Sequence, residues 1–255
     1  MSITARSLPG TSIDPLYPDS DGKPMGESGF HVAAIIHLHT VLTSFFRSRH
    51  DVFVGADMFV YYERGNREAC KAPDVFVAIG VAGNHQRRSF RLWEELVPPT
   101  VVIEVTSTGT FDEDDKVKPL VYARLGVAEY FMFDPDGENL DPSLKGRRLR
   151  DGGYEPIAPD ALGRLPSREL GLLFEVDGPL LRVFDTRAGQ RLMTYDEYEE
   201  IVEAQEQQAK LQEQRAKAQE QRAKVQEQRA EAQRHRIAAL EAELARLRGA
   251  KPSEE

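Results

Sequence analysis

The stretch that decides the fold spans residues 98–135 and reads PPTVVIEVTSTGTFDEDDKVKPLVYARLGVAEYFMFDP. Residues 101–105 form a short apolar run between prolines and a Thr/Ser/Gly cluster, which is typical of a buried strand. Residues 111–125 predict a helix and residues 130–134 a second buried strand, so we expect a strand–helix–strand unit with a right-handed crossover. Glu104 is out of place in the first strand, because a buried carboxylate is costly without a partner. We therefore expect a functional site at the C-terminal end of this strand.

A second acidic residue begins an apolar strand upstream. Residues 52–62 are rich in β-forming residues, and residues 74–79 form an apolar run that starts with Asp74. We expect these two runs to form an antiparallel pair that leads into the strand of Glu104. Asp74 follows Pro73, so a turn aspartate with no functional role would give the same pattern.

The ordered set of motifs resembles a known family. Its parts are P-D-V-F-V at residues 73–77, E-V-T-S at 104–107, D-x-x-x-K-x-x-x-Y at 114–122, G-V-x-E-Y at 126–130 and F-D-P at 133–135. Together they resemble the Uma2 family of restriction-endonuclease-like proteins, within the PD…(D/E)xK nuclease superfamily, over about residues 20 to 195. The resemblance implies an α/β (α+β) fold in which helices flank a mixed β-sheet. It also implies a metal-dependent endonuclease that hydrolyses DNA with Mg²⁺ or Mn²⁺.

The resemblance also implies a set of site residues. Asp74 and Glu104 match the metal-binding carboxylates, and Glu27 matches an acidic ligand that the first helix often offers. The superfamily lysine normally stands two residues after the glutamate, where this chain has Thr106. In the Uma2-like pattern the lysine moves to the following helix, and Lys118 matches it. Thr106 is then a supporting residue that positions a water or caps the helix, while Glu27 could instead be a partner of the helix dipole.

The helix that carries the lysine also carries two possible supporting residues. Asp114, Lys118 and Tyr122 are spaced by four, which places them along one helix face. A simpler interpretation is an ion pair between Asp114 and Lys118, with Tyr122 packed on the sheet. Lys116 is the competing site lysine, although it faces roughly the opposite side of the helix. Pro119 disfavours helical geometry at the residue before it, so the helix could begin or kink there.

Two segments flank this unit. Residues 26–50 predict an amphipathic helix packed on the sheet. Its apolar residues at helical spacing are Val32, Ile35, Ile36, Leu38, Val41, Leu42, Phe45 and Phe46. Before the Glu104 strand, Arg87, Arg88 and Arg91 form a basic cluster that either contacts phosphates or lies on a solvated loop.

The charge is unevenly distributed along the chain. The net charge is −9, from 42 acidic and 33 basic residues. Residues 200–255 hold 11 of each, which leaves 31 acidic and 22 basic residues in residues 1–199. Nucleic-acid binders usually carry a basic footprint, so this balance weakens tight non-specific DNA binding. The alternative function is a catalytically inactive nuclease-fold protein that binds a partner. The single cysteine, Cys70, and the lack of an apolar segment of about 20 residues indicate a cytoplasmic protein with no membrane span.

The C-terminal part is a heptad repeat. We predict a flexible arm over residues 1–25, the nuclease domain over 26–195, a long helix over 196–248 and a disordered tail over 249–255. We also predict a parallel homodimer or higher homo-oligomer through a coiled coil over residues 209–247, with a solitary charged helix as the alternative. The a positions are Ala209, Ala216, Ala223, Ala230, Ile237 and Leu244, and the d positions are Gln212, Gln219, Gln226, Gln233, Leu240 and Leu247.

Overall fold

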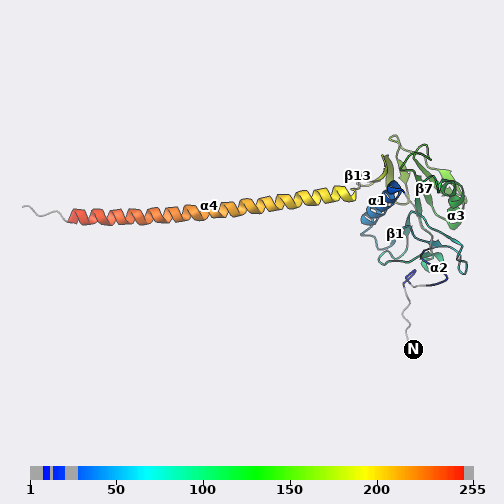
Figure 1. Ribbon diagram of the computed structural model, residues 1–255, viewed down its shortest axis with the longest axis horizontal. Coiled ribbons are helices and arrows are strands. Elements are labelled where there is room, and N and C mark those ends of the chain that lie inside the picture. Colours follow the sequence, from blue (N-terminus) through cyan, green and yellow to red (C-terminus); the bar gives the residue numbers. More distant parts are fainter. Residues whose placement is uncertain (1–7, 12–13, 21–27, 250–255) are drawn as a thin grey trace, which may run out of the picture. The chain divides into compact units, whose positions relative to one another are not determined.

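The predicted strand–helix–strand unit forms the centre of the fold. The computed structural model describes residues 8–11, 14–20 and 28–249. It divides into two compact units, Met1–Tyr195 and Asp196–Glu255 (Figure 1). Among the described residues, no helix has the length and apolar character needed to cross a membrane.

The first unit is built on a six-stranded mixed sheet. The strand order is β1-β4-β6-β7-β8-β9. The β6–β7 pair is parallel, and the other pairs are antiparallel. The predicted antiparallel pair that leads into the Glu104 strand is therefore confirmed. The bounds are β1 Val52–Ala56, β4 Val75–Ile79, β6 Val101–Val105, β7 Glu129–Phe133, β8 Leu144–Arg150 and β9 Gly153–Pro156.

The connection between β6 and β7 is helical from residue 111 to residue 125, as the sequence predicts, but not uniformly so. It contains a π-helical turn, η1 (Glu113–Val117), followed by α3 (Lys118–Leu125). Pro119 lies in the first turn of α3, where a missing N–H costs little. Lys118 keeps helical dihedral angles of φ −56° and ψ −41°. The α-helix thus begins next to Pro119, in line with the expectation that the helix could begin or kink there, and a π-helical turn precedes it.

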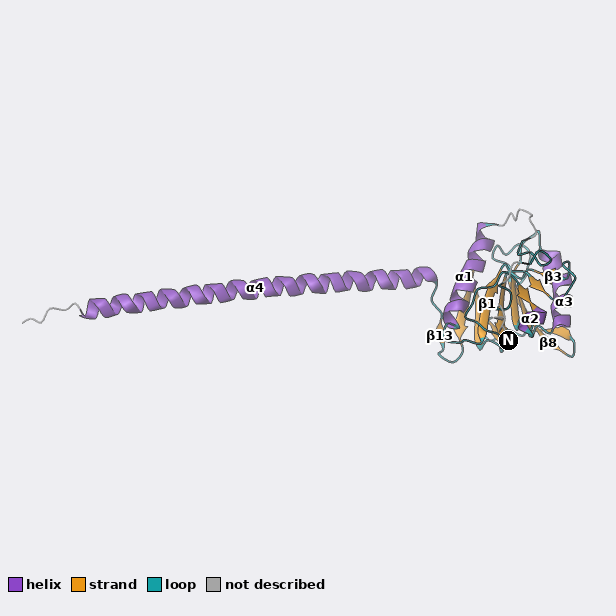
Figure 2. Ribbon diagram, turned by 90° about the horizontal axis from the view of Figure 1, so that it is seen from below, coloured by secondary structure: helices purple, strands orange, loops and turns teal. Residues whose placement is uncertain are grey.

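Two apolar layers cover the two faces of the sheet, and α1 and α3 lie on opposite sides of it (Figure 2). On one face, α1 (Gly29–Phe45) packs together with a second, four-stranded sheet of order β10-β11-β12-β13. On the other face lie α3 and a small sheet of order β3-β2-β5, which leads into α2. The remaining bounds are β2 Val60–Tyr61, β3 Cys70–Lys71, β5 Phe90–Arg91, α2 Leu92–Glu95, β10 Leu165–Ser167, β11 Leu172–Asp177, β12 Leu180–Asp185 and β13 Gln190–Arg191.

The packed face of α1 matches the predicted one in part. Leu38, Val41 and Leu42 of the predicted apolar set are buried against the sheet together with Ala34. Val32 is 44% exposed and Ile36 is 60% exposed, whereas His31 is buried. The helix begins at Gly29, and the Ser28 side chain caps it by accepting a hydrogen bond from the His31 N–H at 3.2 Å. The prediction that this helix packs on the sheet is confirmed, but the expectation that Val32 and Ile36 take part is wrong.

Two of the three arginines before β6 are structural, whereas Arg88 is exposed and pairs with Asp19 at 2.9 Å, as expected of a solvated loop. Arg87 is buried, bonds to Glu95 through Nε at 2.7 Å, and stacks over the Phe53 ring at 4.1 Å. Arg91 is also buried, and its guanidinium contacts Glu94 at 3.1 Å. Neither the phosphate-binding nor the solvated-loop interpretation fits these two side chains.

The described part of the N-terminal arm makes contacts with the domain. Tyr17 is buried, and its hydroxyl accepts a hydrogen bond from the Gly65 N–H at 2.5 Å. The Tyr61 hydroxyl donates to the Pro18 carbonyl at 2.7 Å. Residues 14–20 therefore lie against β2 and its following turn.

Two motif carboxylates hold the fold together. Glu129, at the start of β7, is fully buried and accepts hydrogen bonds from Arg148 on β8 at 2.8 Å and from Ser167 on β10 at 2.5 Å. It therefore links the two sheets. Asp134, directly after β7, accepts hydrogen bonds from three backbone N–H groups of the loop that follows, those of Gly137, Asn139 and Leu140.

The second unit consists of one helix, α4 (Tyr195–Gly249). Every residue of this helix from Glu203 to Arg246 is exposed. Ion pairs between residues four apart run along it, at Glu206–Lys210, Glu213–Lys217 and Glu220–Lys224. Such pairs stabilise an isolated helix by about 0.2 to 0.5 kcal/mol each. The seam residues Ile237, Leu240 and Leu244 are each more than half exposed.

Candidate active site

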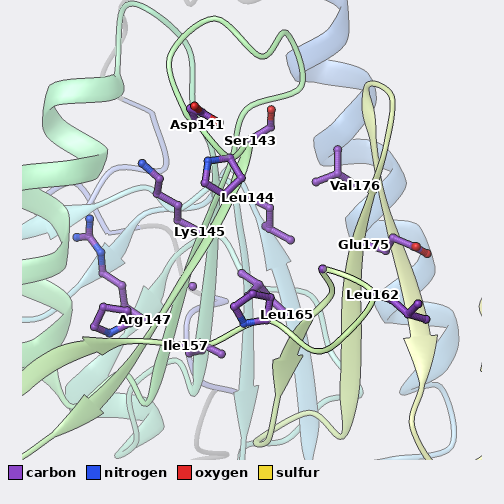
Figure 3. Close-up of a pocket in the computed structure, with 15 residues that line it drawn as sticks. Asp141, Ser143, Leu144, Lys145, Arg147, Ile157, Leu162, Leu165, Glu175 and Val176 are labelled. Carbon is purple, nitrogen blue, oxygen red and sulfur yellow. The ribbon is translucent and has the colours of Figure 1, made fainter.

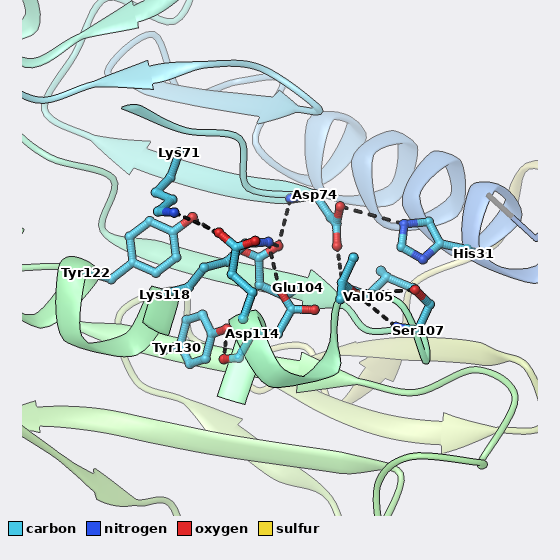
Figure 4. Close-up of polar contacts among 12 residues, drawn as sticks. His31, Lys71, Asp74, Glu104, Val105, Ser107, Asp114, Lys118, Tyr122 and Tyr130 are labelled. Atoms are coloured by element: carbon cyan, nitrogen blue, oxygen red, sulfur yellow. Dashed lines mark hydrogen bonds and ion pairs between the residues drawn. The ribbon is translucent and has the colours of Figure 1, made fainter. Parts of the chain in front are cut away.

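Two carboxylates from adjacent strands meet at one end of the sheet (Figure 4). Asp74 immediately precedes β4, and its backbone N–H donates to Glu104 Oε2 at 3.2 Å. In return, the Val105 N–H of β6 donates to Asp74 Oδ2 at 2.7 Å. The antiparallel register sets this proximity, because Val75 pairs with Ile103 and the next residues outward are Asp74 and Glu104. The structure therefore brings together the two acidic residues that the sequence singles out.

Lys118 completes this cluster from the start of α3. Its Nζ lies 2.9 Å from Glu104 Oε2 and 2.7 Å from Asp114 Oδ1. The Tyr122 hydroxyl donates to Glu104 Oε1 at 3.0 Å. Glu104, Asp114 and Tyr122 are fully buried. The predicted helix face is thus turned toward the carboxylates, and we call Asp74, Glu104, Asp114, Lys118 and Tyr122 the carboxylate cluster.

The competing lysine lies elsewhere. Lys116 is exposed and pairs with Asp112 on its own helical turn at 2.6 Å. The π-turn widens the helix but leaves Lys118 and Asp114 in contact across one turn. Of the two lysines, only Lys118 reaches Glu104.

Burial dominates the electrostatics of the cluster. Burial raises the pKa of the Glu104 carboxyl to about 8, while Lys118 lowers this pKa and Asp74 and Asp114 raise it further. For Lys118, burial by itself lowers the pKa of the ammonium, but attraction to Glu104, Asp114 and Asp74 outweighs it, so the pKa rises. Lys118 is therefore charged at neutral pH. An added cation would draw Glu104 into its ionised form.

Two residues beside Asp74 extend the site. His31 Nε2 on α1 lies 3.7 Å from Asp74 Oδ1. Asp57, directly after β1, has a left-handed φ of 45°, and its backbone N–H donates to the Asp74 carbonyl at 3.1 Å. Partial burial raises the pKa of the Asp57 carboxyl, and the Asp74 charge raises it further. Asp57 is not among the predicted site residues. The sequence does contain a signal for it, because Asp57 is an acidic residue directly after an apolar strand, as Asp134 is.

The cluster also contains buried polar atoms with unused hydrogen-bonding capacity. Thr106 Oγ1 and Asp114 Oδ2 have no hydrogen-bond partner among the described residues. Thr106 follows Glu104 by two residues, so their side chains leave β6 on the same face. Buried polar atoms in folded proteins are almost always satisfied by protein, solvent or ligand. These two atoms therefore give the cluster hydrogen-bonding capacity that the described residues do not use.

Glu27, the third predicted carboxylate, lies outside the described residues. Within the described ranges, no group of three or more His, Cys, Asp and Glu residues is arranged to hold a metal ion.

A hollow of about 770 Å³ lies away from the carboxylates. It is bounded by β8 and β9 on one side and by β10 and β11 on the other (Figure 3). Leu144, Ile157 and Leu165 form an apolar part of its wall. It includes neither Asp74 nor Glu104, and its lining has no paired carboxylates directed at a common point.

The mixed sheet, the crossover helix and the carboxylate cluster define a restriction-endonuclease-like α+β protein. A comparison with family models bears directly on this class. The model described as "Uma2: Putative restriction endonuclease" matches residues 17–187, about two thirds of the chain. The chain belongs to the Uma2 family, and this membership supports nuclease activity.

A search of solved structures found a chain from Anabaena variabilis, described as "a putative nuclease belonging to DUF820". It is 20% identical, and the match covers 59% of this chain and 80% of that chain with a TM-score of 0.43. No curated protein matches this chain.

Proposed function

We propose that this protein is a metal-dependent endonuclease that hydrolyses DNA phosphodiester bonds. The observation that carries the proposal is the convergence of Asp74, Glu104 and Lys118 from β4, β6 and α3. Lys118 Nζ and the Asp74 backbone N–H bond to the same oxygen of Glu104, at 2.9 and 3.2 Å. Two carboxylates that hold a divalent cation, beside one lysine, can perform phosphodiester hydrolysis, and family membership supports the same activity.

The donor atoms of the cluster fit Mg²⁺ or Mn²⁺. Both ions prefer hard oxygen ligands, and Mg²⁺ is commonly bound through one or two carboxylates together with waters and substrate phosphates. Asp74 and Glu104 would hold the ion, and Glu27 is a third candidate by resemblance alone. The bound ion would stabilise charge on phosphate oxygens and lower the pKa of a water. The two unsatisfied buried oxygens, on Thr106 and Asp114, are consistent with a polar guest near the carboxylates.

The protein's own side chains would supply position and charge. Lys118 is fixed between two carboxylates, so its ammonium would stabilise negative charge on the phosphate or orient the attacking water. Tyr122 would hold Glu104 in place through its hydroxyl, and Asp114 would hold Lys118. Thr106, on the same face as Glu104, would position a water through its free hydroxyl.

The test is cleavage of plasmid and single-stranded DNA with Mg²⁺, Mn²⁺ or EDTA. We expect wild type to cut only with a divalent cation, and both Glu104→Gln and Lys118→Met to lose activity by at least about 100-fold. Lys116→Met is the matched control and should remain active. Calorimetric titration with Mn²⁺ should show binding that Asp74→Asn weakens. Cleavage in EDTA, or full activity of Lys118→Met, contradicts the assignment.

A second candidate function is an inactive nuclease fold that binds a partner through α4. The exposed heptads of α4 favour it, and both functions are compatible with self-association. Carried back from Ile237, the register places Tyr195 and Val202 at a and Tyr198 at d, so the seam has apolar residues at both ends. Ile at a with Leu at d favours a two-stranded coil.

The charges of the repeat favour a parallel coil. The e positions are Glu213, Glu220 and Glu227, and the g positions are Arg215, Arg222 and Arg229. In a parallel pair, each g arginine faces an e glutamate of the other helix, whereas an antiparallel pair brings like charges together. We therefore propose a parallel homodimer.

Light scattering combined with size-exclusion chromatography tests the dimer. We expect twice the chain mass for wild type, and monomers for Ile237→Asn combined with Leu240→Asn. A matched double change at the outward f positions, Gln214→Asn with Gln221→Asn, should leave the dimer intact. Wild type that is monomeric at all accessible concentrations contradicts the coil.

A further inference from the structure

Lys145 lies in the same row of the sheet as the carboxylates. Glu104 pairs with Met132 across the parallel β6–β7 ladder, and Met132 pairs with Lys145 across the antiparallel β7–β8 ladder. Paired residues in neighbouring strands project from the same face, so Glu104, Met132 and Lys145 share one face. Two strand spacings separate Glu104 from Lys145, about 10 Å between their Cα atoms.

The neighbouring residue on β8 shows which side this is. Arg147 is two residues further along the strand and therefore leaves the same face as Lys145. Its guanidinium bonds to Asp115 on η1, the turn that also contributes Asp114 to the carboxylate cluster. Figure 3 shows the Lys145 and Arg147 side chains pointing to the same side, away from Leu165 and Val176. The Lys145 ammonium is thus on the side of the cluster.

Lys145 differs from the other cations of this face in its pairing. Lys118 is paired with Glu104 and Asp114, Lys71 with Glu113 at 2.7 Å, and Arg147 with Asp115. Lys145 is partly buried, yet within the described chain no carboxylate lies within ion-pair distance of it. Its charge is available for an anion from outside the chain.

We propose that Lys145 binds a backbone phosphate of the DNA strand that lies across the carboxylates. This inference rests on the proposed nuclease function and names how its substrate is held. An ammonium binds phosphate as a point charge, and such contacts set the register of the nucleic acid without reading its sequence. With a rise of about 3.4 Å per nucleotide, a reach of about 10 Å places the bound phosphate within about three nucleotides of the cleaved bond.

The size of the effect follows from counterion release. One phosphate contact contributes a slope of about 0.9 in log K against log salt for duplex DNA and about 0.7 for a single strand. Salt at 0.1 M is one decade below 1 M, so one phosphate contact strengthens binding at 0.1 M by about eightfold for duplex DNA and by about fivefold for a single strand. We therefore expect Lys145→Met to raise the Kd for DNA by about five- to eightfold and to lower the salt slope by about 0.7 to 0.9. The kcat should change by less than about twofold, because the contact is made in both the ground state and the transition state.

The experiment measures binding and turnover on full-length protein. The probe is a short fluorescein-labelled duplex, titrated by anisotropy at several salt concentrations with Ca²⁺ in place of Mg²⁺, and cleavage is measured separately with Mg²⁺. Lys145→Arg keeps the charge and should restore both Kd and salt slope. Lys217→Met on α4 removes the same charge outside the nuclease unit and should match wild type. Thermal unfolding checks the fold of each variant.

Each outcome is decisive. If Lys145→Met has the Kd and salt slope of Lys217→Met while wild type binds and cuts DNA, the inference is overturned and the nuclease function stands. A weaker Kd with an unchanged salt slope also overturns it, because a structural role would then explain the loss. If wild type neither binds nor cuts DNA, both the inference and the proposed function fail, and this is seen before any variant is compared.

Discussion

Replacing Glu104 by glutamine should stabilise the protein in the absence of divalent cations. The pKa of this carboxyl is raised from 4.5 to about 8 in the folded state, first because of burial. A group with a raised folded pKa contributes most to stability when protonated, and that contribution is lost as pH rises from about 4.5 to about 8. pH 7 lies about 2.5 units above the unfolded pKa of 4.5, so at this pH the loss of folding stability amounts to about 3 kcal/mol. Glutamine, a neutral isostere, avoids this loss.

The remaining contacts of the cluster support the same direction. Breaking a buried ion pair usually costs about 3 to 5 kcal/mol, because one charge is left uncompensated. Here Lys118 keeps Asp114 at 2.7 Å when Glu104 becomes neutral, so no ammonium is stranded. The glutamine amide oxygen can accept from Lys118 Nζ and the Asp74 N–H, and its NH₂ group can donate to the Tyr122 hydroxyl oxygen. The raised pKa of Glu104 should therefore decide whether Glu104→Gln raises or lowers the free energy of unfolding.

The assay is urea unfolding in EDTA at pH 5 and pH 7, with Glu155→Gln as a control for loss of an exposed carboxylate. Glu104→Gln should exceed wild type by less than about 1 kcal/mol at pH 5 and by about 3 kcal/mol at pH 7. Mg²⁺ should reverse the order, because a cation at the proposed site favours ionised Glu104 and stabilises only wild type. A difference that does not change with pH, or a Gln variant that is less stable at pH 7, refutes the reasoning.

Three further predictions concern the same unit, each measured by urea unfolding in EDTA. Lys118→Met leaves the fully buried Asp114 carboxylate without its cation, while Glu104 is mostly protonated at pH 7, and should lower the free energy of unfolding by about 3 to 5 kcal/mol at this pH, with Lys116→Met as a neutral control; an unchanged midpoint contradicts the buried ion pair. Glu129→Ala strands the Arg148 guanidinium and should cost about 3 to 5 kcal/mol, whereas a loss below about 1 kcal/mol would show that the two sheets are not coupled there. Gly55→Ala places a Cβ at 2.3 Å from the Phe76 ring and should cost about 1 to 3 kcal/mol; a stable variant would show that the ring can move aside.

The sequence predicts the pairing of Asp74 with Glu104 because both interrupt apolar strands that are close in the chain. A short antiparallel connection and a helical crossover leave few ways to arrange such strands. Lys118 is predicted from the resemblance to the Uma2 pattern and from the helix face that it shares with Asp114 and Tyr122, although Pro119 obscures the local geometry. The π-turn resolves this, and a pattern of helical spacing gives no signal for such a turn.

Other features depend on contacts between residues distant in the chain. Glu129 meets Ser167 across 38 residues, and Gly10 meets Glu94 across 84. The local sequence carries no information about such distant pairings. Arg87 and Arg91 are therefore predicted to be solvated or to bind phosphates, although both side chains are buried. The prediction fails at Val32 and Ile36 on α1 for a related reason. All of its apolar residues fit a helical period, and only the position of the sheet decides which stripe is covered.

The repeat of α4 makes this helix a spacer that can change length in fixed steps. Seven residues advance a helix by about 10.5 Å and turn it through about 700°, which is 20° short of two full turns. Loss or gain of one A-K-x-Q-E-Q-R unit would therefore leave every remaining a and d residue on the same seam. The middle units are nearly identical, so one copy can substitute for another. Only the apolar ends, with Tyr195 and Leu244 among them, identify a unique alignment of two such chains.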